Sequence, residues 1–287
     1  MDIDARFPSK LDTVHDAPEP FRSALVNNVP SHESVRLIVY APALVVDERL
    51  PATVLAVTDK SWLIASETEG GATTSIEKSD FSDTLFLELA SILLSDQLKI
   101  HFARVGTSYS ATTTFEAVGE DLYREAIDFM LNGIDPTPSP AVEDERDHAL
   151  ISETWPIKFR TEAHRSRPKG QRLLGAIQWP AIFGGFQREL CPAGALLVTK
   201  RELVLISEEK TSPRQHSGDL HKFGGIITHF PVVRLADLRV YHQERFGVLA
   251  LQVHATHGGE KLEIIFPSDQ EEAVSKALAQ VMIPSND

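Results

Sequence analysis

The sequence predicts a mainly β fold of the α+β class, in which two similar units follow one another along the chain. Residues 21–131 and 171–282 carry the same succession of apolar and polar patterns. Several segments in each unit alternate apolar and polar residues, as strands with one buried face do. Each unit then ends in a pattern with helical spacing. The chain is therefore expected to contain two antiparallel β domains, each followed by a helix.

The repeat is clearest at the end of each unit, where a strand pattern runs into a helix pattern. Phe115 and Phe266 occupy equivalent places, 151 positions apart. The helix patterns at 120–131 and 271–282 both open with two acidic residues, which favour a helix start because they face the positive end of the helix dipole. Their apolar stripes match position for position: Leu122, Tyr123, Ala126, Ile127 and Met130 in the first unit, and Ala273, Val274, Ala277, Leu278 and Val281 in the second. In the second unit Ser268 and Glu271 also form a candidate capping box, whereas the first unit has Ala117 at the place of Ser268.

Upstream segments repeat as well. Residues 57–67 and 198–208, 141 positions apart, both indicate a strand, a polar turn and a second strand. Both units are also predicted to begin with a short helix stopped by proline, at 22–30 and 172–180. Offsets that differ between segments are expected where loop lengths differ. The alternative is that two unrelated strand-rich domains alternate alike by chance, but the shared order of elements and the matching final helix favour duplication.

The predicted domain boundaries follow composition. Residues 1–20 are an amino-terminal extension, 21–134 the first domain, 135–170 a linker and 171–287 the second domain. The linker begins with Asp135 and prolines at 136, 138 and 140, which exclude a helix there and favour a semi-rigid spacer. Domains of this length lie near the commonest domain size.

Charge and cysteine content narrow the classes of partner. Most of the net charge of −13 falls in the first unit. This acidic unit should be repelled by nucleic acid and by anionic membranes. The alternative is that the acidic surface only maintains solubility. The lone Cys191 excludes an intrachain disulfide, and the sequence shows neither a secretory signal nor an apolar run long enough to span a membrane. A cytoplasmic protein without stable membrane insertion is expected, and homo-oligomerisation is left open.

One stretch of the linker concentrates positive charge and is the candidate partner-binding site. Its residues are expected to lie in a polar loop that meets an acidic partner, a phosphate group or the acidic first unit. The alternative is a solvated loop balanced by the acidic residues at 143–145. The candidate residues are Lys158, Arg160, Arg165, Arg167, Lys169 and Arg172.

Motifs for catalysis or cofactor binding are absent from the sequence, which has no phosphate-binding loop, dinucleotide fingerprint, zinc-protease helix or nucleophile elbow. His254 and His257 are the nearest approach to a metal pair, but three positions along a strand place them on opposite faces. His216 and His221 form a second, weak candidate pair. Neither pair has a third ligand at a recognisable spacing. No metal, no cofactor and no catalytic residue is therefore predicted.

The hairpin at 197–206, with Thr199 and Arg201 in its turn, and the strand patterns from 222 to 238 resemble those of bacterial pleckstrin-homology-like (GRAM-like) domains. The resemblance covers most of 171–282 and, more weakly, 31–131. It implies two tandem bent antiparallel β-barrels, each closed by its carboxyl-terminal helix, on a scaffold that binds lipids, peptides or other domains and seldom catalyses. Here the loop at 47–49 is acidic on balance, which argues against phosphoinositide binding.

Two functional hypotheses follow from the sequence. The first is a non-catalytic intracellular binding or scaffolding protein whose ligand is unknown. The alternative is a small-molecule-binding or hydrolytic enzyme with its site at the cleft between the domains.

Overall fold

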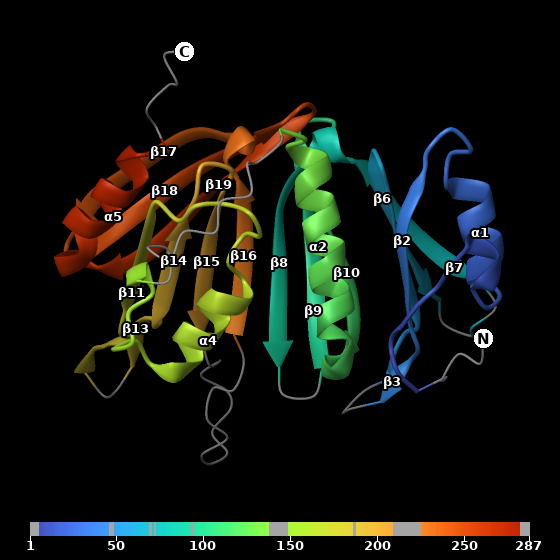
Figure 1. Ribbon diagram of the computed structural model, residues 1–287, viewed down its shortest axis with the longest axis horizontal. Coiled ribbons are helices and arrows are strands. Elements are labelled where there is room, and N and C mark those ends of the chain that lie inside the picture. The colour runs from blue at the N-terminus through green and yellow to red at the C-terminus, as the bar shows by residue number, and fades with distance from the viewer. Residues whose placement is uncertain are drawn as a thin grey trace. The chain divides into compact units, whose positions relative to one another are not determined.

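The computed structural model describes residues 6–45, 49–68, 71, 73–92, 95–137, 149–185, 188–208 and 225–281. The chain divides into two compact units, which are described separately (Figure 1). The first unit comprises residues 1–136 together with 255–258, and the second comprises 137–254 and 259–287. Both units are built mainly from antiparallel strands, so the prediction of a mainly β protein is confirmed. The hydrogen-bonded strands that the structure describes do not close into a barrel.

The first unit contains two groups of antiparallel strands. The first group pairs in the order β1-β2-β5-β6-β7, and the second in the order β10-β9-β8. The elements are β1 (Ser9–Lys10), α1 (Phe21–Asn28), β2 (Val35–Ala41), β3 (Leu44–Val45), β4 (Arg49–Leu50), β5 (Thr53–Thr58), β6 (Ser61–Glu67), β7 (Thr74–Asp80), the 3-10 turn η2 (Phe81–Asp83), β8 (Thr84–Ile92), β9 (Ser95–Arg104), β10 (Thr107–Glu116), the 3-10 turn η3 (Ala117–Gly119) and α2 (Glu120–Ile134).

The second unit repeats this plan. One group of strands pairs in the order β16-β15-β14-β11, and the other in the order β17-β18-β19. The elements are α4 (Ile157–Arg165), β11 (Gly175–Trp179), β12 (Ile182–Phe183), β13 (Glu189–Cys191), β14 (Gly194–Val198), β15 (Glu202–Glu208), β16 (Gly225–Pro231), the 3-10 turn η5 (Val232–Arg234), β17 (Leu235–Gln243), β18 (Phe246–Ala255), β19 (Gly258–Pro267), the 3-10 turn η6 (Ser268–Gln270) and α5 (Glu271–Ala279).

The correspondence between the units extends to local irregularities. From η2 to the start of α2, each element has a counterpart 151 positions later, from η5 to the start of α5. The ladder between β8 and β9 shifts register between Thr84 and Phe86, and that between β17 and β18 shifts between Leu235 and Asp237, again 151 positions later. A two-stranded hairpin also follows the first long strand in both units, β3 with β4 and β12 with β13. The units therefore share a topology from β2 in the first and β11 in the second to the final helix, whereas β1 has no counterpart among the described strands of the second unit.

The predicted helix at 172–180 is wrong. This segment contains β11, which pairs antiparallel with β14. Burial alternates strictly from Gln171 to Trp179, a period of two that suits a strand with one buried face. The helix that occupies the place of α1 is α4 instead, since α1 packs against β5, β6 and β7, and α4 packs against the equivalent β14 and β15.

Both predicted flanking segments also contain ordered structure. In the extension at 1–20, β1 pairs with β2, and Leu11 and Ala17 are buried. In the linker at 135–170, α4 buries Phe159 and Ala163, which are four positions apart and lie on one helix face. The apolar residues of these segments explain why they pack on their units.

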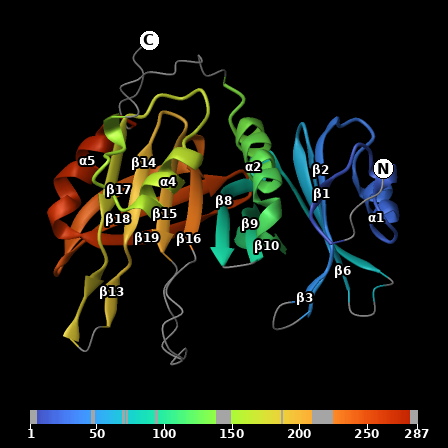
Figure 2. The ribbon, with the colours of Figure 1, turned by 60° about the horizontal axis from the view of Figure 1, so that its bottom comes forward.

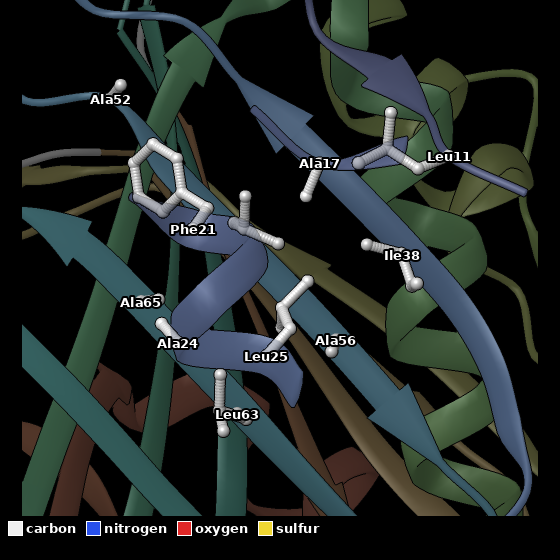
Figure 3. Close-up of a cluster of buried hydrophobic side chains, with 11 residues drawn as sticks. Leu11, Ala17, Phe21, Ala24, Leu25, Ile38, Ala52, Ala56, Leu63 and Ala65 are labelled. Carbon is white, nitrogen blue, oxygen red and sulfur yellow. The ribbon is translucent and has the colours of Figure 1, made fainter. Parts of the chain in front are cut away.

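The sheet of the first unit is covered on both faces. Every residue of β5 is buried. On one face, Phe21, Ala24 and Leu25 of α1 join side chains of β2, β5 and β6 in an apolar cluster (Figure 3). On the other face lie β10 and α2, which pack against β2, β5 and β6. Figures 1 and 2 show α1 and α2 on opposite sides of β2.

The final helices begin in the same way in both units, without the predicted cap. A 3-10 turn leads directly into each helix, and no side chain caps α5, so the capping box of Ser268 and Glu271 is not formed. The 3-10 turn bonds the amide of Glu271 to the carbonyl of Ser268 instead. The carbonyl oxygen of Ser268 thus accepts the hydrogen bond from the Glu271 amide that the Ser268 side chain was expected to accept.

Candidate functional site

The first unit contains a cavity of about 380 Å³. It lies where the end of α1, the turn between β5 and β6, strand β7 and the turn between β9 and β10 meet. All of its lining residues belong to the first unit, His257 included. Its apolar lining includes Val29, Pro30, Trp62, Leu63, Ala103 and Val105, and its charged lining includes Glu33, Lys78, Asp80, Asp83 and Arg104.

A buried carboxylate lies in this lining. The side chain of Glu33 is only 6% exposed. One of its oxygens, Oε2, accepts hydrogen bonds from the hydroxyls of Thr58 and Ser61, both at 2.6 Å. Among the described residues, the other oxygen, Oε1, has only the Nε2 atom of His32 nearby, at 3.9 Å, and accepts no hydrogen bond.

The turn between β5 and β6 holds these hydroxyls in place. Thr58 Oγ1 accepts from the backbone amides of Lys60 and Ser61, at 3.1 and 2.8 Å. A threonine that bonds to the two amides ahead of it stabilises a tight turn. Asp59 and Ser34 exchange backbone and side-chain hydrogen bonds, which tie the segment next to Glu33 to the same turn.

The guanidinium of Arg104 is held by groups other than Glu33. It donates to the carbonyl oxygen of Lys78 at 3.1 Å and lies 5.4 Å from the ring centre of Phe102. A guanidinium nitrogen of Arg104 lies 4.0 Å from a carboxylate oxygen of Glu77.

Deeper in the unit, the indole N–H of Trp62 donates to Thr84 Oγ1 at 2.9 Å, and this hydrogen bond fixes the orientation of the fully buried side chain.

The equivalent hairpin of the second unit contains a buried carboxylate that is paired within the chain. Thr199 repeats the turn of Thr58, and accepts from the amide of Glu202 at 3.0 Å. The carboxylate of Glu202 then meets His229 Nδ1 at 2.9 Å, with both side chains less than 10% exposed. Phe230, which is 2% exposed, stands in β16 where β7 of the first unit has Ser79.

The predicted basic site is divided between α4 and the segment that follows it. Lys158 Nζ lies 3.4 Å from Glu208, and Arg165 lies 3.5 Å from Glu162. Arg160 donates to the carbonyl oxygen of Glu153 at 3.2 Å. Lys158, Arg160 and Arg165 lie in the helix α4 and not in the expected polar loop. Phe159 and Ala163 anchor this helix to the sheet. The other three, Arg167, Lys169 and Arg172, follow the helix before β11. Binding of a partner by the six residues stays a prediction.

The histidine candidates do not assemble. Within the described part of the chain, no group of three or more His, Cys, Asp or Glu side chains is placed to hold a metal ion. His216 and His221 lie outside the described residues, as do Asp47 and Glu48 of the acidic loop. His254 is exposed on β18, and His257 Nδ1 lies 2.8 Å from Asp83.

Cys191 is buried, and its thiol donates to the carbonyl oxygen of Ile265 at 3.2 Å.

Sequence reasoning missed Glu33. The available signal was the pair of turns at Thr58 and Thr199, which stand 141 positions apart in the aligned hairpins. That pattern predicts the turn, but it does not identify the carboxylate that the turn holds, because Glu33 is 25 positions away in sequence.

A search of protein-family models found none that matches this chain, and a comparison with curated proteins found no significant match. Of the helices that the structure describes, none is both long and apolar enough to cross a membrane.

Proposed function

We propose that this protein is a non-catalytic, cytoplasmic binding or scaffolding protein built from two pleckstrin-homology-like modules. The observation that carries the proposal is the topology that the two units share. Each has four long antiparallel strands, then three more, then a carboxyl-terminal helix. This order of strands followed by a helix supports the proposal, and a scaffold of this kind serves recognition by its surfaces and loops.

The basic stretch is the proposed contact for an acidic partner. Lys158 and Arg165 each already face a carboxylate of the second unit, which reduces the charge they offer to a partner. Arg167, Lys169 and Arg172 follow α4, so they can be replaced without altering that helix. Exposed ion pairs contribute about 0.2–1 kcal/mol each, so several are needed and the binding should weaken with salt.

The proposal is tested by affinity capture with the full chain from the native cytoplasm, followed by replacement of Arg167, Lys169 and Arg172 by glutamine. The expected result is a specific partner that the wild type retains and the triple variant loses. Replacing Arg245, Lys261 and Lys276, three exposed basic residues of the second unit, is the matched control. Retention of the partner by the triple variant would exclude the basic stretch as its contact, and failure of the full chain to capture anything specific would argue against the binding function.

The small-molecule part of the alternative hypothesis has one observation in its favour, the cavity beside Glu33. That cavity belongs to the first unit alone.

A further inference from the structure

We infer that the cavity of the first unit binds a small organic cation, a primary ammonium group on a compact apolar body. This inference deepens the proposed binding function by naming a ligand class, and it rests on the premise that the first unit recognises a ligand. It rests on the hydrogen bonding of the Glu33 carboxylate, on the charged and apolar residues that line the cavity, and on the buried Glu202–His229 pair of the second unit.

The carboxylate of Glu33 is only half satisfied by the protein. Oε2 accepts from two hydroxyls, whereas Oε1 accepts no hydrogen bond from the described residues and keeps contact with solvent at the cavity. A largely buried carboxylate is stabilised most by an opposite charge that also donates hydrogen bonds. An ammonium group has a positive charge and three donors. It is therefore the chemical group that best completes the coordination of Oε1.

The groups around the cavity also favour a cation near Glu33. Asn28, Val29 and Pro30 bring the carboxyl-terminal end of α1 to the cavity, and that end carries the negative pole of the helix dipole. Asp80 and Asp83 add two further carboxylates to the lining, and Asp83 lies 2.8 Å from His257 Nδ1. The lining also contains two cations, Arg104, which donates to the carbonyl oxygen of Lys78, and Lys78 itself, which is exposed.

The walls suit an apolar body of limited size. Val29, Pro30, Trp62 and Leu63 line the cavity, whose volume is about 380 Å³. Ligand sites are typically apolar hollows with a few placed polar groups. A single aromatic ring carrying an aminomethyl group combines these features.

The second unit supports the inference by contrast. There the buried carboxylate of Glu202 has a nitrogen partner of the protein itself, His229, at 2.9 Å. By strand register Glu202 and His229 correspond to Ser61 and Lys78, and in the first unit the hydroxyl of Ser61 donates to Glu33. A buried carboxylate thus has a nitrogen partner in the second unit, whereas Lys78, at the place of His229, lies within 4.0 Å of no described carboxylate.

Isothermal titration calorimetry on the full chain tests the inference, with benzylammonium chloride as the probe and benzyl alcohol as its neutral analogue. Benzylammonium should bind at one site per chain, and benzyl alcohol should bind at least about tenfold more weakly, since a charged hydrogen-bond partner is replaced by a neutral one. Glu33→Gln should weaken benzylammonium by a similar factor. Glu272→Gln, which removes an exposed carboxylate of the second unit, should leave binding unchanged.

A second variant keeps the test decisive if Glu33→Gln does not fold. Ser79→Phe adds a large side chain to a position in the cavity lining, leaves Glu33 intact, and should abolish binding. Circular dichroism confirms the fold of each variant. Equal binding of the amine and the alcohol, unchanged binding by folded Ser79→Phe, or no binding by the wild type at millimolar probe would each overturn the inference. None of these results affects capture of a partner through the basic stretch, so the two proposals fail separately.

Discussion

Single residues in the first unit show how buried polar groups are paired. Trp62 is fully buried, and its indole N–H depends on the hydroxyl of Thr84. Phe115 and Tyr123 stack with ring centres 3.5 Å apart, and burial raises the pKa of Tyr123 to about 12. The Tyr123 hydroxyl therefore stays neutral inside the core, where a charge would be costly.

Replacement of Thr84 by valine should destabilise the first unit by about 1–3 kcal/mol, because a donor is left buried without its acceptor. Urea unfolding of the full chain, followed by tryptophan fluorescence, measures the change. Thr107→Val, at an exposed position of β10, is the matched control and should change stability by less than about 0.5 kcal/mol. Equal stability of the two variants would contradict the role assigned to this hydrogen bond.

A pH effect should also arise at a single residue. Burial alone would raise the pKa of Glu88, but the hydrogen bond to His101 at 2.7 Å and the charges of His101 and Lys99 lower it by more, so that its net pKa lies below the usual value. A carboxyl group whose pKa is lower in the folded state stabilises the protein above its unfolded pKa of about 4.3. This stability is lost as the pH falls through the lower folded pKa.

The expected observation is a fall in the urea midpoint below about pH 4.5 that is smaller in Glu88→Gln than in the wild type. Glu116→Gln, on strand β10 of the same group of strands, serves as the control and should follow the wild type. A variant of Glu88 with the same acid dependence as the wild type would contradict the assignment.

At the scale of elements, α4 is the clearest departure from the sequence-based expectation. Its burial comes from two residues, Phe159 and Ala163, which lie on one face against β14 and β15. The neighbouring Ile157 is 72% exposed. Docking of the helix should therefore depend on one aromatic side chain.

Phe159→Ala should destabilise the second unit by about 3 kcal/mol or more, the usual loss when a buried phenylalanine is truncated. Ile157→Ala, in the same helix turn, should have little effect because that side chain is already exposed. Hydrogen exchange of the amides in 157–165 would report the loss of docking directly. Similar exchange rates in the two variants would show that α4 is held by other contacts.

At the scale of the whole molecule, the compact units define where the chain can be cut. The second unit includes α4, so a fragment that begins at 149 should fold alone and give a dispersed amide spectrum. A fragment that begins at 171 loses the contacts of Phe159 and Ala163 and should unfold at a lower urea concentration. A collapsed spectrum from the longer fragment would show that the unit depends on the rest of the chain.

The sequence by itself determined the final helix of each unit and most of each apolar stripe. Of the predicted stripe residues, Tyr123, Ala126, Ile127 and Met130 in α2, with Val274, Ala277 and Leu278 in α5, are buried, whereas Ala273 is exposed. These features depend on a period of 3.6 residues, which neighbouring side chains specify along the chain. The period of two at 171–179 likewise indicates a strand, in conflict with the prediction of a helix over 172–180.

Only the tertiary structure decided which distant residues meet. Glu33 reaches Thr58 and Ser61 because β2 pairs with β5, and α4 joins the second unit because a sheet face is open to Phe159. The hairpin of the second unit holds a buried ion pair because the facing strand carries His229, where the facing strand of the first unit carries Lys78. Such contacts depend on how separate elements pack, and no local period specifies them.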